Sequence, residues 1–114
     1  MEIVSMILHG LLAATFLMAG LGKVSGSKMH VEGFQHWRLP QWFRVTTGLV
    51  ELVAAISLIV GFWINDWATF GAALLAITAI GGVLTHVRVK DSIKETLPII
   101  VLGLLAFGVL FLNL

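Results

Sequence analysis

Residues 45–64 read VTTGLVELVAAISLIVGFWI, an apolar stretch whose one charged residue is Glu51. At about 1.5 Å rise per residue, roughly 20 helical residues span the hydrocarbon core of a bilayer. Three further segments have a similar length and composition, so the chain has four stretches that are long enough to cross a membrane. These three cover residues 3–22, 67–87 and 97–114.

The seven Lys and Arg residues all fall in two stretches, 23–44 and 88–94. A charge in hydrocarbon costs about 2.5–3.5 kcal/mol on insertion scales, so spanning sequences keep basic residues in their loops. With four crossings, both stretches lie on the same side of the membrane, which the positive-inside rule makes the cytoplasm. We therefore expect a multi-pass protein with both termini outside and the basic loops 23–44 and 88–95 cytoplasmic.

The composition excludes several classes of protein. The chain has 114 residues, of which 59% are hydrophobic and 11% charged, whereas soluble domains carry about 25% charged residues. We predict an all-α fold, an antiparallel four-transmembrane-helix bundle formed by a single domain of residues 1–114. The net charge of +1 gives no reason to expect nucleic acid as a partner, and the absence of cysteine excludes thiol chemistry by the chain itself.

The first loop is the longest polar stretch. Residues 28–37 place Met29, Val31, Phe34 and Trp37 among polar residues. This pattern predicts a short interfacial helix between the first two spans.

Glu51 is the sharpest chemical signal, because an acidic residue within a span marks a candidate functional site. It lies roughly 9 Å inside the cytoplasmic end of its span, at a depth where the antiparallel arrangement also brings Lys23, Arg44, His86 and Arg88. Two interpretations remain open. Glu51 and Lys23 form either a structural ion pair that fixes helix register, or part of a site that handles protons or a ligand.

The histidines do not suggest a metal or haem site, and we assign none. His9 and His86 lie at opposite depths, while His30 and His36 lie in the first loop with no carboxylate or cysteine pattern around them. His36 and the adjacent Trp37 are candidates for the mouth of a pocket, or alternatively for an interfacial anchor.

Taken in order, several short motifs resemble the DoxX-like family of small bacterial and archaeal membrane proteins. The motifs are Phe16-x-x-x-Gly20-x-x-Lys23-Val24, then Phe34 and Leu39-Pro40, then Gly48-x-x-Glu51, then an Ala- and Gly-rich third span ending in His86. The resemblance implies a four-helix bundle in a prokaryotic plasma membrane, associated with quinone-linked redox chemistry or oxidative stress. More distant relatives act as assembly factors.

We therefore expect an apolar, cytoplasm-facing pocket within the bundle that binds a lipophilic small molecule such as a quinone, with no covalently bound cofactor. If the protein is part of an enzyme, it is a subunit of a quinone-linked oxidoreductase that receives electrons from a partner protein. A non-catalytic assembly or interaction subunit is the alternative, a small transporter ranks last, and homodimerisation stays open. Glu51 and His86 are the candidate proton-relay groups. The candidate ligand-binding residues are Lys23, Glu51, His86, Gly20, Gly48, Arg44, His36 and Trp37.

Overall fold

The computed structural model describes residues 2–114, which form five α-helices and no strand. All helices except α2 have the length and hydropathy needed to cross a membrane. The predicted all-α bundle with a short helix in the first loop is confirmed. The helices are α1 (Ile3–Ser25), α2 (Lys28–His36), α3 (Gln41–Val60), α4 (Asn65–Arg88) and α5 (Ile93–Leu112).

Helix α3 begins at Gln41 and ends at Val60, whereas the hydropathy pattern predicts residues 45–64. The early start follows from Pro40, which occupies the N-cap position with φ −67° and ψ 153°. The Pro40 carbonyl accepts hydrogen bonds from the backbone N–H groups of Phe43 at 3.1 Å and Arg44 at 3.4 Å. Proline is tolerated at a helix start, where its missing N–H is not needed.

Helix α5 also begins before its apolar stretch, at Ile93 instead of the predicted residue 97. Oγ of Ser92 accepts a hydrogen bond from the Glu95 N–H at 3.1 Å, and Oε1 of Glu95 accepts one from the Ser92 N–H at 3.5 Å. These two bonds form a capping box, which satisfies backbone donors at the helix start. Hydropathy does not detect such polar first turns, because they lie outside the hydrocarbon.

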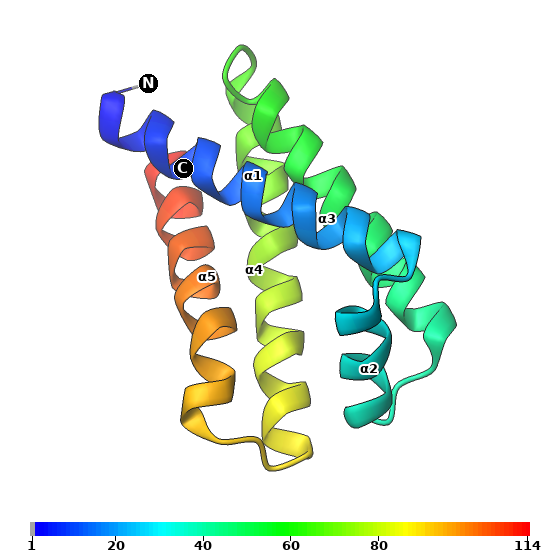
Figure 1. The fold of residues 1–114 in the computed structure, drawn as a ribbon. Helices are drawn as coiled ribbons and strands as arrows, with labels where there is room; N and C mark the ends of the chain where they lie inside the picture. The colour runs from blue at the N-terminus through cyan, green and yellow to red at the C-terminus, as the bar shows by residue number, and fades with distance from the viewer. Residues whose placement is uncertain (1) are drawn as a thin grey trace.

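The helices pack in a simple order: α1 lies along α3, α3 along α4, and α4 along α5, while α1 also touches α5. Figure 1 shows α2 lying between the ends of α3 and α4, opposite the end of the molecule that holds the termini. The stretches 23–44 and 88–94, which contain all seven Lys and Arg residues, lie at the α2 end. We call it the basic end.

The packed core lies mainly in the half of the bundle away from the basic end. Many of its buried residues are alanines, which let the helices approach closely. At the basic end a cavity lies between α3 and α4, and Phe34 of α2 contributes to its wall. The largest fully buried core side chains are those of Leu12, Phe16, Leu58, Leu75 and Val109.

A polar contact closes the bundle at the opposite end. His9 is fully buried, and its Nδ1 lies 2.6 Å from the carbonyl oxygen of Ser5 while its Nε2 lies 3.0 Å from Nδ2 of Asn113. The Asn113 amide also donates to the carbonyl of Val109 at 2.7 Å. Because the amide can only donate to Nε2, Nδ1 of His9 carries the proton and donates to Ser5. This network ties the start of α1 to the end of α5.

The outward faces of the long helices are strongly apolar. Ile7 is 55% exposed, Ile56 54% and Leu104 68%. In water, such a surface would cost roughly 25 cal/mol per Å², whereas in lipid it costs nothing. The protein is therefore an integral, multi-pass membrane protein whose helices contact the bilayer.

Candidate functional site

A close contact between two glycines positions the central pair of the site. A Cβ atom on Gly20 of α1 would lie 2.9 Å from the carbonyl oxygen of Gly48 on α3, and a Cβ on Gly48 would lie 2.8 Å from Cβ of Lys23. Only glycine allows two helix backbones to approach so closely. Lys23 and Glu51 each follow their glycine by about one turn, so the helix crossing brings these two side chains together.

Lys23 and Glu51 form an ion pair inside the bundle. Nζ of Lys23 lies 2.9 Å from Oε1 of Glu51, and the two side chains are 12% and 4% exposed. The Lys23 ammonium is the charged partner of Oε1, and no other donor from residues 2–114 bonds to this atom. Because a buried carboxylate is costly without such a partner, the ion pair offsets much of the cost of burying Glu51.

Arg44 does not join this pair. Its Nε donates to Oε1 of Gln41 at 2.7 Å, and its Nη1 donates to the backbone carbonyl of Lys23. That carbonyl belongs to the last turn of α1, where carbonyls lack helical partners. Arg44 thus fastens the end of α1 to the first turn of α3. Nearby on α2, burial lowers the pKa of His30, and the positive charges of Lys23 and Arg44 lower it further.

A cavity of about 400 Å³ lies beside the ion pair, between α3 and α4 and under α2. Its volume falls within the range of small-molecule sites, about 300–1,000 Å³. Most of its wall is apolar. The apolar part comes from α2, α3, α4 and α5, and includes Phe34, Trp37, Phe43, Val50, Ile77 and Ile99.

The polar part of the cavity wall is small. Lys23, Glu51 and His86 contribute to it, together with four threonines. Each threonine hydroxyl donates to a carbonyl four positions earlier on its own helix, so it can only accept a further hydrogen bond from a ligand. The threonines are Thr46, Thr47, Thr78 and Thr85.

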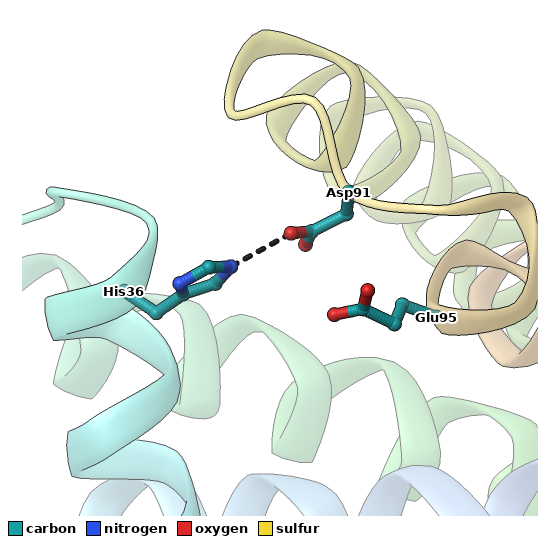
Figure 2. Close-up of side chains that lie close together, drawn as sticks. All are labelled: His36, Asp91 and Glu95. Carbon is teal, nitrogen blue, oxygen red and sulfur yellow. Dashed lines mark hydrogen bonds and ion pairs between the residues drawn. The ribbon is translucent and has the colours of Figure 1, made fainter.

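Next to the cavity, Asp91 lies in the loop between α4 and α5 and contacts side chains from α2 and α4. Nε2 of His36 lies 2.7 Å from Oδ1 of Asp91, and Nδ1 of His86 lies 2.7 Å from Oδ2. The indole N–H of Trp37 donates to Oδ2 at 3.2 Å, and Arg88 donates to the Trp37 carbonyl. Figure 2 shows His36 reaching across from α2 to meet Asp91. We call His36, Trp37, His86 and Asp91 the Asp91 cluster.

The Asp91 carboxylate is held in its ionised form. The hydrogen bond from His36 has the largest effect and lowers the pKa of Asp91, and the bonds from His86 and Trp37 lower it further against the opposing effect of burial. The side chain is 5% exposed. Since the same rings of Trp37 and His86 line the cavity, Asp91 fixes the position of part of the cavity wall.

Comparison with known proteins agrees with this architecture. The sequence model of the DoxX-like family matches residues 7–109. The chain belongs to the DoxX-like family. A relative, the uncharacterized protein YdgD of Bacillus subtilis (strain 168), is 32% identical over 81 residues, which cover 71% of this chain and 70% of the relative. No solved structure matches the chain.

The structure separates the eight predicted ligand-binding residues of this DoxX-like protein into two groups. Lys23, Glu51, His86 and Trp37 lie on the cavity wall. The other four lie elsewhere and act on the site indirectly. Gly20 and Gly48 form the helix crossing, Arg44 fastens the end of α1, and His36 contacts Asp91.

Asp91 was not predicted as a site residue, and neither was Glu95. His36 has no acidic residue close to it in the sequence, but the fold brings Asp91 to it from 55 positions away. This contact depends on the direction in which α2 leaves α1, which hydropathy does not determine. The one sequence signal was the position of Asp91 within a loop of alternating charge, which is also typical of a plain polar turn.

Proposed function

We propose that this DoxX-like membrane protein binds a lipophilic small molecule, such as a quinone, in the cavity between α3 and α4. The observation that carries the proposal is the combination of an apolar wall with the buried Lys23–Glu51 ion pair beside it. A planar ring with one polar edge matches both features. The apolar wall takes the ring and tail, while Glu51 and Lys23 meet the polar head.

The two ends of the ion pair suit the two redox states of a quinone head. The Lys23 ammonium donates hydrogen bonds, as a quinone carbonyl requires, and the Glu51 carboxylate accepts them, as a quinol hydroxyl requires. Reduction of a quinone takes up protons as well as electrons. Glu51 and His86 both line the cavity and are the candidate groups for moving protons to or from the ligand.

In this proposal the protein is a membrane component of quinone-linked redox or oxidative-stress chemistry. The chain contains no cysteine, and electrons come from a redox partner protein. By the positive-inside rule we expect the basic end, and with it the cavity, to face the cytoplasm. The family resemblance makes a prokaryotic plasma membrane the expected location. Both termini then lie outside.

Gly81 offers a sharp test of ligand binding. It lines the cavity, and a Cβ atom built on it meets no atom within 4 Å. The Cβ of a Gly81→Leu side chain therefore meets no neighbour, and we expect the rest of the side chain to take up space in the cavity. Gly108 on α5 is equally open but lies away from the cavity, so Gly108→Leu is the matched control.

The experiment is a titration of the detergent-solubilised protein with decylubiquinone, a short-chain benzoquinone, followed by quenching of tryptophan fluorescence. We expect saturable quenching in the wild type and in Gly108→Leu. Gly81→Leu should raise the dissociation constant by about tenfold or more, equivalent to about 1.4 kcal/mol. Equal saturable quenching in Gly81→Leu and the wild type, with both folded, would refute binding in this cavity.

A non-catalytic interaction subunit is the second candidate. The open surfaces at Gly10 and Gly108, where a Cβ would meet no neighbouring atom, favour it because small residues let another helix approach closely. Co-purification of a stoichiometric membrane protein that is lost in Gly108→Leu, together with no saturable quinone binding, would support this function instead. The same surfaces would serve a homodimer.

A further inference from the structure

Three side chains with metal-binding atoms meet at the basic end, outside the ion pair and the cavity. His36 comes from α2, Asp91 from the α4–α5 loop and Glu95 from the first turn of α5, and their ligand atoms all lie within 4.8 Å of one another. Figure 2 shows the Glu95 carboxylate directed toward His36 and Asp91. From this convergence we infer that His36, Asp91 and Glu95 bind a divalent first-row transition-metal ion.

The distances suit a metal after a small adjustment. Ligand atoms at about 2.0–2.2 Å from a tetrahedral zinc ion lie roughly 3.3–3.6 Å apart. The side chain of His36 is 56% exposed and Glu95 is exposed, so both can rotate by the roughly 1 Å that is needed. Asp91, the nearly buried ligand, does not need to move far.

The surroundings of Asp91 resemble the outer shell of a metal ligand. His86 and Trp37 both donate hydrogen bonds to Oδ2, which fixes the carboxylate and leaves Oδ1 directed toward His36. Such donors orient a ligating carboxylate and are a regular part of metal sites. The Nε2 proton of His36 lies between the ring and Oδ1, in the place that a metal ion would take. On binding, the neutral ring would carry its proton on Nδ1.

The donor set also indicates the class of metal. One imidazole and two carboxylates suit zinc, iron, cobalt or manganese, whereas magnesium and calcium prefer oxygen donors alone. Lys90 and Lys94 each adjoin one of the acids in sequence, so the charge attraction for a cation is reduced. The imidazole is therefore the donor that favours binding, and the site should select zinc over magnesium.

The consequence for the protein is a link between α2 and the α4–α5 loop. His36 and Trp37 are adjacent, and Trp37 lines the cavity. A metal held by His36 and Glu95 would keep α2 closed over the cavity. The proposed metal site consists of His36, Asp91 and Glu95 alone, and its binding of a metal does not depend on what the cavity binds.

The test is a Zn²⁺ titration of the detergent-solubilised protein by isothermal calorimetry, with a purification tag that contains no histidine. We expect one Zn²⁺ per chain, weaker binding of Mg²⁺ by at least about tenfold, and weaker Zn²⁺ binding at acid pH because the ligands take up protons. His36→Gln and Glu95→Gln should each raise the dissociation constant for Zn²⁺ by about tenfold or more. Glu95→Gln is the cleaner variant, because glutamine also forms a capping box and preserves the start of α5.

Two control variants come from α2 itself. His30→Gln and Glu32→Gln change the same residue types on the same helix, but neither residue belongs to the group of three ligands. Both should bind Zn²⁺ like the wild type, and Zn²⁺ should raise their melting temperature but not that of Glu95→Gln. No Zn²⁺ binding by the wild type, equal affinity in Glu95→Gln, or equal affinity for Mg²⁺ would each overturn the inference.

Discussion

Removing one partner of the Lys23–Glu51 pair should destabilise the protein far more than removing both. Nζ of Lys23 and Oε1 of Glu51 are 2.9 Å apart, and their side chains are 12% and 4% exposed. Leaving one buried charge without its partner costs about 3–5 kcal/mol, whereas replacing a buried pair by apolar residues is often neutral or stabilising. The double variant Lys23→Met with Glu51→Leu should therefore be close to the wild type in stability.

The two single variants should also differ from each other. Lys23 lies in the last turn of α1, which ends at Ser25, whereas Glu51 lies ten positions inside α3, which begins at Gln41. At about 1.5 Å per residue, Glu51 is roughly 15 Å from its helix start. A lone Lys23 can extend its stem toward the interface, but a lone Glu51 cannot reach water. Lys23→Met should cost about 3–5 kcal/mol, and Glu51→Leu about 1–2 kcal/mol.

The assay is a thermodynamic cycle, with the free energy of unfolding measured in mixed detergent micelles titrated with a denaturing detergent. With a double variant close to the wild type, the two single costs imply a favourable coupling energy of about 4–7 kcal/mol between the two positions. A double variant whose destabilisation equals the sum of the two single variants would refute the reasoning. So would two single variants of equal stability.

Three other predictions concern single positions. Gly48→Ala should lower the free energy of unfolding by about 1–3 kcal/mol because its Cβ would lie 2.8 Å from Cβ of Lys23. Gly10→Ala, whose Cβ meets no neighbour, should raise the free energy of unfolding by up to about 1 kcal/mol. Equal effects of the two variants would contradict the close crossing of α1 and α3 at Gly48. Asp91 has a lowered pKa in the folded state, so the stability it contributes is present above its ordinary value of 3.8 and is lost as the pH falls below that value. Acid titration of stability in the wild type and Asp91→Asn should therefore converge at low pH, and parallel curves would contradict this. Ser92→Ala should cost about 1 kcal/mol through loss of the cap on α5, which thermal unfolding followed by circular dichroism would detect.

Much of the architecture could be predicted from sequence because the bilayer limits the options. The cost of a charge in hydrocarbon places the loops, and the span length follows from the helix rise. The depth of Glu51 in its span, and of Lys23 at the end of the first span, predicts that the acid and the lysine lie at the same level of the bundle. The observed ion pair agrees with that shared depth.

The remaining features depend on interactions that a hydropathy pattern does not contain. Helices α3 and α5 begin in polar turns set by Pro40 and by the Ser92 cap, so their ends differ from the apolar stretches. The wall of the cavity is formed by residues from all five helices and the loop before α3, so its presence depends on how the whole bundle packs. The contact between His36 and Asp91 links residues far apart in sequence and depends on the direction of a short helix.

The division of the bundle into a tightly packed half and a hollow half has a consequence for how such proteins diversify. The helices are kept in register by Gly20, Gly48, His9 and Asn113. None of these residues belongs to the part of the cavity wall that α4 forms. Mutations at Ile77, Gly81 or Thr85 can therefore reshape the chamber while the scaffold keeps its stability. A lineage built on this plan can change the shape and lining of this cavity by few substitutions, without having to evolve a new fold.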